Sequence, residues 1–282
     1  MPEERQAVDT GQAWMDGLPE ALRGQRRILQ GLFDFSGAAP EVRWLAVSCS
    51  LARGAGDRLS DVDAGIGAAD GLVEEVARRI LALDLGERVD ALAMEWPGGA
   101  QPLRRLFVQF ADDSQLDLVV MPAGTRPGRA PDEVVLLDRD GLLAEEFTPG
   151  ADRVDGEKVR EWAFLGWVAL ADCAKYLERG SLWEAQARLQ EARDRIWALW
   201  AAARGARYPV FGLSQVLDHD PRDLPPGIAG TVAELMTVPA LRAAAQQSAR
   251  VLDTASAAAA ERCPTPLPVR LAGYVRARLE PR

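Results

Sequence analysis

The sequence has few cysteines, one histidine and no long hydrophobic run. Its cysteines, Cys49, Cys173 and Cys263, stand far apart, so they give neither a metal-ligand spacing nor a disulfide framework. His219 alone makes no metal site. No run of about 18 apolar residues is present, which argues against a membrane span. With a polar, acidic N-terminus that lacks the pattern of a secretory signal, these features predict a cytoplasmic protein.

Lysine is also scarce, and acidic residues outnumber basic ones. The net charge is −9 and the pI is about 4.9, and Lys158 and Lys175 are the only lysines in the sequence. A protein that binds nucleic acid carries a basic footprint, so nucleic acid is not an expected partner. An acidic field concentrates small cations, which fits a cationic substrate; solubility is the plainer explanation for the same charge.

The pattern of elements changes near residue 150. The first part predicts helices and strands in alternation, and the second part predicts helices only. We therefore expect an α+β protein, with a small mixed-sheet catalytic domain over residues 1–150 and an all-α helical bundle over 151–282. The expected strands span 42–50, 60–67, 87–96 and a hairpin at 103–122; the expected helices span 18–34, 71–84, 156–180, 181–205, 239–262 and 268–280.

Three aspartates occupy strand positions with apolar neighbours. Asp61 and Asp63 are two residues apart, so their side chains share one face of a strand, and Asp117 stands within "QLDLVV". Carboxylates in apolar surroundings are costly unless they are neutralised. Mg²⁺ is bound by a few carboxylates together with substrate phosphates. The loop at 48–56 offers hydroxyl and N–H groups for phosphate oxygens, so the sequence predicts two-metal phosphoryl or nucleotidyl transfer.

The stretch "CSLARGAGDRLSDVD", residues 49–63, resembles the signature of the nucleotidyltransferase superfamily that includes DNA polymerase β. The resemblance covers roughly residues 40–122, with Asp117 at the place of the third family carboxylate. Cys49 departs from the family, which usually has glycine there; either the loop still holds phosphate, or it is deformed and nucleotide binding is weakened. The matching residues are Ser50, Arg53, Gly54, Asp57, Ser60, Asp61 and Asp63.

Within the superfamily, the layout is similar to that of the antibiotic nucleotidyltransferases, in particular the streptomycin adenylyltransferase group. The resemblance implies Mg²⁺-dependent transfer of a nucleoside monophosphate, from a triphosphate expected to be ATP, to a hydroxyl of a small cationic acceptor such as an aminoglycoside. It also implies a role in antibiotic resistance and suggests a homodimer. No acceptor can be read from the sequence itself.

Roles for single residues follow from the resemblance. Asp61, Asp63 and Asp117 would bind metal, and Asp117 would be either a ligand of the second metal or the general base. The phosphates would be held by Ser48, Ser50 and Arg53, and an ion pair with Asp57 is the structural alternative for Arg53. Asp57 itself is expected to stabilise the loop.

A polar stripe on the helix expected at 156–180 gives further candidates. Asp172 and Lys175 are three residues apart, and Glu161 lies about three turns before Asp172, on the same side. Lys175 would reach the triphosphate, and Glu161 or Asp172 would bind an acceptor amine. A solvated face with an Asp172–Lys175 pair is the alternative. Glu95, at the end of a strand, is a further candidate for acceptor binding.

Two other functions remain open at this point. One is nucleotidylation of a protein or of an RNA end, which the acidic composition and the large helical part disfavour. The other is a nucleotide-binding protein that has lost its activity, which is prompted by Cys49. The three carboxylates argue against this second alternative, because a protein without metal chemistry has little use for them in strands.

Overall fold

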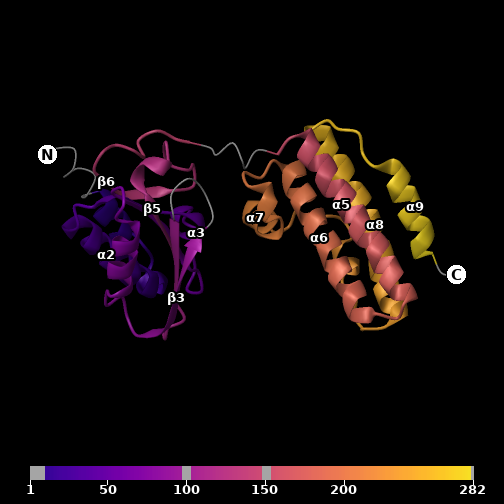
Figure 1. Cartoon of the computed structure of the whole chain (residues 1–282), viewed down its shortest axis with the longest axis horizontal. Coiled ribbons are helices and arrows are strands. Elements are labelled where there is room, and N and C mark those ends of the chain that lie inside the picture. Colours follow the sequence, from indigo (N-terminus) through magenta and orange to yellow (C-terminus); the bar gives the residue numbers. More distant parts are fainter. Residues whose placement is uncertain (1–9, 97–102, 148–153, 281–282) are drawn as a thin grey trace. The chain divides into compact units, whose positions relative to one another are not determined.

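The structure is a computed structural model that describes residues 10–96, 103–147 and 154–280. The chain divides into two compact units, Met1–Thr148 and Pro149–Arg282. In Figure 1 the first unit is coloured indigo to magenta and the second pink to yellow. Each unit has its own hydrophobic core, and each is described by itself below.

A six-stranded mixed sheet forms the centre of the first unit. The strand order is β3-β4-β5-β2-β1-β6; β2 pairs with β5 in parallel, and all other neighbours are antiparallel. This arrangement confirms the predicted mixed sheet. The strands are β1 (Val42–Val47), β2 (Val62–Ala68), β3 (Arg88–Trp96), β4 (Leu103–Phe110), β5 (Gln115–Pro122) and β6 (Val134–Asp138).

Two amphipathic helices, α2 (Arg23–Ala38) and α4 (Val73–Leu81), pack on one face of this sheet. Their apolar residues recur at helical spacing, and alternate residues of the strands meet them, because strand side chains alternate between faces. The result is a single core on that face. The core includes Ile28, Leu29, Leu32, Val76, Ile80, Ile66, Leu106, Leu116, Leu118 and Val120.

The other face of the sheet carries a smaller apolar cluster around Trp44. The Trp44 indole is completely buried, and its Nε1 donates a hydrogen bond to the carbonyl of Ala123 at 3.2 Å. The ring lies directly over Gly67 of the neighbouring strand, where a Cβ would stand 2.1 Å from Nε1. Glycine at this position is therefore a steric requirement for placing Trp44.

We predict that Gly67→Ala destabilises the first unit by about 2 kcal/mol, because an added methyl must displace a buried indole and its hydrogen bond. The midpoint of urea unfolding measures this. Gly37→Ala is the matched control, since nothing lies within 4 Å of a Cβ at this helical position; it should raise stability by up to about 1 kcal/mol. Equal effects of the two substitutions would contradict the packing argument.

The second unit is a helical bundle, as the sequence predicts. Helices α5, α6 and α8 pack against one another, and α9 packs on α5 and α8 (Figure 1). Among the described helices, none is both long and apolar enough to cross a membrane. The helices are α5 (Gly156–Glu178), α6 (Leu182–Arg204), α7 (Leu213–His219), α8 (Val238–Arg262) and α9 (Val269–Leu279).

Sequence signals explain where the long helices begin and end. The Asp155 side chain accepts a hydrogen bond from the Lys158 backbone N–H at 2.9 Å, and so caps the start of α5. Gly180, with φ +71°, follows the end of α5 and makes the tight turn into α6. Four of the five tryptophans on α5 and α6 are buried in the core of the bundle, and Trp183 is exposed.

Among the elements that the sequence analysis did not predict are three short ones near the site or between the long helices. The segment at Val134–Asp138 forms the edge strand β6 beside β1. The loop after β1 contains one helical turn, α3 (Cys49–Ala52). The Pro- and Gly-rich stretch between α6 and α8 contains α7. All three are too short to give a clear periodic pattern in the sequence.

Candidate active site

Three aspartates gather on the face of the sheet opposite α2 and α4. In the parallel ladder Asp63 of β2 is the direct partner of Asp117 of β5, so the two side chains point to the same face. Asp61 directly precedes β2 and lies two residues from Asp63, again on this face. The residue between them, Val62, is buried in the core on the other side. The structure thus brings the three predicted carboxylates together.

The surroundings of Asp63 in this cluster clearly shift its pKa. Burial, followed by the negative charge of Asp61, raises the pKa of Asp63 to about 6. The charge of Asp117 adds to the rise, whereas a hydrogen bond from the Cys49 thiol and the charge of Arg105 oppose it. An aspartate with a raised pKa is one whose negative charge lacks sufficient compensation. A cation bound at this point would supply that compensation.

Asp117 has a protein partner of its own. Arg105, on the neighbouring strand β4, donates Nε to Oδ1 of Asp117 at 2.8 Å and Nη2 to Oδ2. The Arg105 guanidinium lies 4.4 Å from the centre of the Phe107 ring. Both oxygens of Asp117 are therefore engaged by one guanidinium, in the two-pronged geometry that arginine forms with carboxylates.

The residues fit a divalent metal in part. Oxygen donors are what Mg²⁺ prefers, and the carboxylates of Asp61 and Asp63 offer them beside an uncompensated negative charge. Arg105 uses one lone pair on each oxygen of Asp117, so this carboxylate has fewer positions left for a metal ion. Accordingly, across residues 10–96, 103–147 and 154–280 no group of three or more His, Cys, Asp or Glu side chains is arranged to hold a metal ion.

The loop between β1 and β2 keeps the backbone shape that glycine normally provides. Cys49 has φ +59°, in the left-handed region that costs a non-glycine residue about 1 kcal/mol. The Cys49 thiol donates a hydrogen bond to Asp63, and burial together with Asp63 raises the pKa of this thiol to about 12. The cysteine therefore remains a neutral hydrogen-bond donor and does not become a thiolate nucleophile.

An ion pair that is largely shielded from water supports the start of this loop. Ser48 donates its hydroxyl to Oε1 of Glu133 at 3.1 Å. Glu133 also binds the guanidinium of Arg126 through both oxygens, at 3.0 and 2.5 Å, and Arg126 lies over the Trp44 ring. Because a serine hydroxyl has one proton, Ser48 has none left for a phosphate. In this structure Ser48 supports the loop through Glu133, and its contact with a phosphate stays a prediction.

The rest of the loop is held by hydrogen bonds within the loop and by hydrogen bonds from α2. Gln25, buried on α2, donates to the carbonyls of Arg58 and Ser60 at 3.1 and 2.7 Å. Asp57 accepts the Leu59 N–H at 2.9 Å, a turn-stabilising bond of the kind expected for this residue. These contacts fix the chain that leads into Asp61.

Ser50 and Arg53 lie on or next to α3. Arg53 makes an ion pair with Asp132 at 4.0 Å. Ser50 is partly exposed, and its hydroxyl makes no side-chain hydrogen bond within the described residues. The first amides of a helix have no acceptor inside that helix. Ser50 is therefore the hydroxyl of this loop that remains able to bind an anion.

The predicted acceptor residue Glu95 lies away from the carboxylates. Met94 is the direct partner of Arg105, and Glu95 that of Arg104. Successive strand residues point to opposite faces, so Glu95 points to the face that carries α4. There Arg104 pairs with Glu74 of α4. This placement removes Glu95 from the proposal below.

The candidates on α5 form local ion pairs. Lys175 pairs with Asp172, as the structural alternative expects, and lies 4.9 Å from the Tyr176 ring centre. Glu161 pairs with Lys158 at 2.8 Å. Their side chains are roughly one-third to one-half exposed. The suggested contacts of Glu161, Asp172 and Lys175 with substrate stay predictions.

A pocket of about 180 Å³ adjoins the carboxylates. It combines an aromatic ring with two amides: Gln115 donates to Oε1 of Gln109 at 2.6 Å, and Phe107 lies beside them. Such a mixture binds a small polar molecule with an apolar face. The residues that line it are Asp61, Phe107, Val108, Gln109, Gln115, Leu116 and Asp117.

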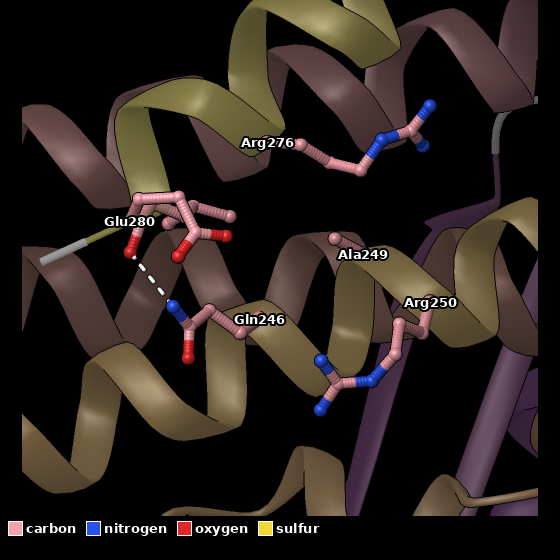
Figure 2. A pocket seen from close by; sticks show the side chains of 6 residues that line it. Gln246, Ala249, Arg250, Arg276 and Glu280 are labelled. Carbon is pink, nitrogen blue, oxygen red and sulfur yellow. Dashed lines mark hydrogen bonds between the residues drawn. The ribbon is translucent and has the colours of Figure 1, made fainter.

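A second pocket, of about 200 Å³, lies between α8 and α9. Figure 2 shows the guanidinium groups of Arg250 and Arg276 and the amide of Gln246 that line it. Gln246 donates to the Leu279 carbonyl at 3.0 Å. Arg276 pairs with Asp253 and Arg250 donates to a neighbouring glutamine, so both side chains already have partners. We assign this pocket no function.

Sequence reasoning missed Arg105, Glu133, Arg126 and Gln25. Each acts through a partner that is distant in sequence or on another strand, so no local motif marks it. Arg105 alone left a signal, since it lies on the same face of a predicted hairpin as Asp117.

The sequence matches no family model and no curated protein. Among solved structures, the chain is similar to the crystal structure of an aminoglycoside 6-adenyltransferase from Bacillus subtilis. The identity is 15%, the match covers 89% of this chain and 95% of that chain, and the TM-score is 0.38.

Cys49→Gly is predicted to stabilise the first unit by up to about 1 kcal/mol, because glycine adopts positive φ without strain. Ser50→Gly is the matched control one residue further on, at a helical position where glycine costs about 1 kcal/mol. Urea unfolding of both variants measures whether each substitution raises or lowers the free energy of unfolding. A destabilisation of equal size at both positions would show that Cys49 carries no backbone strain.

Asp63 should make stability fall as the pH rises. Its pKa is raised from the ordinary value of 3.8 to about 6 in the folded protein, so the folded state binds more protons between these values and loses stability from about pH 4 to pH 6. Without divalent cations, Asp63→Asn should therefore stabilise the protein by about 2 kcal/mol at pH 7.5, and by much less at pH 4.5.

Unfolding by urea in the presence of a chelator, from pH 4.5 to 7.5, measures this difference. Asp113→Asn is the control, since this aspartate is 70% exposed on the β4–β5 turn. A gain for Asp63→Asn that does not change with pH would contradict the prediction.

Proposed function

We propose that this protein is a Mg²⁺-dependent nucleotidyltransferase that transfers a nucleoside monophosphate from a triphosphate, ATP in our proposal, to a hydroxyl of a small cationic acceptor. The observation that carries the proposal is the parallel register of β2 and β5, which sets Asp63 opposite Asp117 at the end of a loop with the nucleotidyltransferase motif. An aminoglycoside is the acceptor class we propose, and antibiotic resistance is the role that would follow.

The residues of the site have separate tasks in this reaction. Asp61 and Asp63 would hold Mg²⁺, which when bound screens the triphosphate and stabilises negative charge on the reacting phosphate. The Ser50 hydroxyl would bind a phosphate oxygen. Glu133 would hold Ser48 and with it the start of the loop. These contacts keep the loop in one shape, so that no reorganisation is needed when the nucleotide binds.

The pocket beside the carboxylates supports a polar, cationic acceptor. Asp61 lies at its edge and attracts a positive amine. Gln115, whose Nε2 donates to Gln109, keeps an amide oxygen that can accept a hydrogen bond from an acceptor hydroxyl, and Phe107 offers a face for the apolar side of a sugar ring. We propose that the acceptor hydroxyl approaches the nucleotide from this pocket.

The decisive experiment is release of pyrophosphate. The full chain is incubated with Mg²⁺, each of the four nucleoside triphosphates and a pooled panel of aminoglycosides and lincosamides. We expect release that depends on both the triphosphate and the acceptor. Asp63→Asn should lower it at least about 100-fold, a loss of about 3 kcal/mol in transition-state stabilisation. Asp113→Asn, an isosteric change at an exposed carboxylate, should leave the rate within about twofold.

The alternatives give different results. Triphosphate binding in calorimetry with no release from any acceptor would favour a nucleotide-binding protein without activity. Release with a protein or an RNA end as acceptor, and none with the panel, would favour nucleotidylation of a macromolecule. Absence of both binding and release would refute the proposal.

A further inference from the structure

Arg105 occupies the place at Asp117 where a second metal ion would bind. Its guanidinium reaches both carboxylate oxygens of Asp117. The side chains of Arg105 and Asp117 are 24% and 15% exposed, so the pair is largely shielded from water. Arg105 also lies against the Phe107 ring, which restricts its movement. A cation that binds Asp117 must either displace this guanidinium or share the carboxylate with it at close range.

Before a nucleotide binds, the charge count of the site favours one divalent cation. Asp61, Asp63 and Asp117 carry three negative charges when ionised, Arg105 carries one positive charge, and a single divalent ion brings the sum to zero. A second divalent ion at Asp117 would stand next to a fixed guanidinium. Like charges a few ångströms apart repel one another strongly when they are shielded from water.

The register of the strands gives this pair its position. Phe107 is the direct partner of Asp117 and Arg105 that of Val119, so Arg105 is diagonal to Asp117 on the same face. A long side chain reaches across that diagonal. The next residue, Arg104, belongs to the opposite face, where it pairs with Glu74.

We propose that the site binds a single divalent cation, on Asp61 and Asp63, and that the guanidinium of Arg105 takes the position of the second cation at Asp117. This inference rests on the proposed function and departs from the two-metal arrangement that the sequence predicts. Asp117 then acts through Arg105, which it holds beside the reacting groups. Arg105 is accordingly a positioning residue that also supplies a fixed positive charge.

The test is a count of bound Mn²⁺ by electron paramagnetic resonance. The full chain is saturated with a non-hydrolysable α,β-methylene analogue of ATP and titrated with Mn²⁺. We expect one ion per complex in the wild-type chain and two in Arg105→Gln, because the substitution releases Asp117. Arg104→Gln, the neighbour on the other face, is the matched control and should keep one ion.

Two wild-type ions per complex would overturn the inference, and so would a single ion in folded Arg105→Gln. The wild-type count depends on no variant, so it decides the matter even if Arg105→Gln does not fold. If the wild-type chain binds two ions and still releases pyrophosphate in a way that depends on Asp63, the single-cation inference is overturned but the proposed function stands. A chain that binds neither Mn²⁺ nor the analogue would overturn the proposed function as well.

Discussion

The parallel pairing of β2 with β5 is the constraint on which the site depends. Between these strands the chain makes α4, β3 and β4, and it returns to place β5 beside β2 in one register. A slip by one residue would move Asp117 to the face that carries the core and would place an apolar neighbour opposite Asp63. The burial of Leu116 and Leu118 on the core face therefore fixes the position of the carboxylate. Core packing and site geometry are two consequences of the same register.

The loop after β1 is also held by the sheet, through residues next to the edge strand β6. Ser48 is joined to Glu133, which directly precedes β6, and Arg126 links Glu133 to the ring of Trp44. An ion pair this well shielded is stable only when its remaining hydrogen-bonding atoms are satisfied, and Glu133 achieves this with the Ser48 hydroxyl and a backbone N–H. The loop thus rests on contacts within the sheet layer, which is consistent with the positive φ of Cys49 being maintained without glycine.

Much of the fold could be predicted from sequence because its signals are local. The hairpin at 103–122 and the long helices have strong periodicity, and their boundaries are close to those observed. The carboxylates were also predictable, since strand alternation alone puts Asp61 and Asp63 on one face. The hydrogen-bond partners that hold the loop were not predictable from sequence. Nothing local in the sequence joins Gln25 to the carbonyl of Ser60, or Glu133 to Ser48. Glu95 illustrates the limit of such prediction. Its side chain points away from the site, whereas the side chain of the neighbouring residue on the strand, Met94, points to the face that carries the site.

Cys49 combines a strained backbone with a hydrogen bond to the candidate site. Cys49 adopts a positive φ, a backbone shape that glycine adopts without strain, at a cost of about 1 kcal/mol. In return its thiol gives Asp63 a hydrogen bond. This bond favours the ionised carboxylate, the form that binds a cation. The substitution thus strains the loop and at the same time supports the charge of the residue that the loop positions.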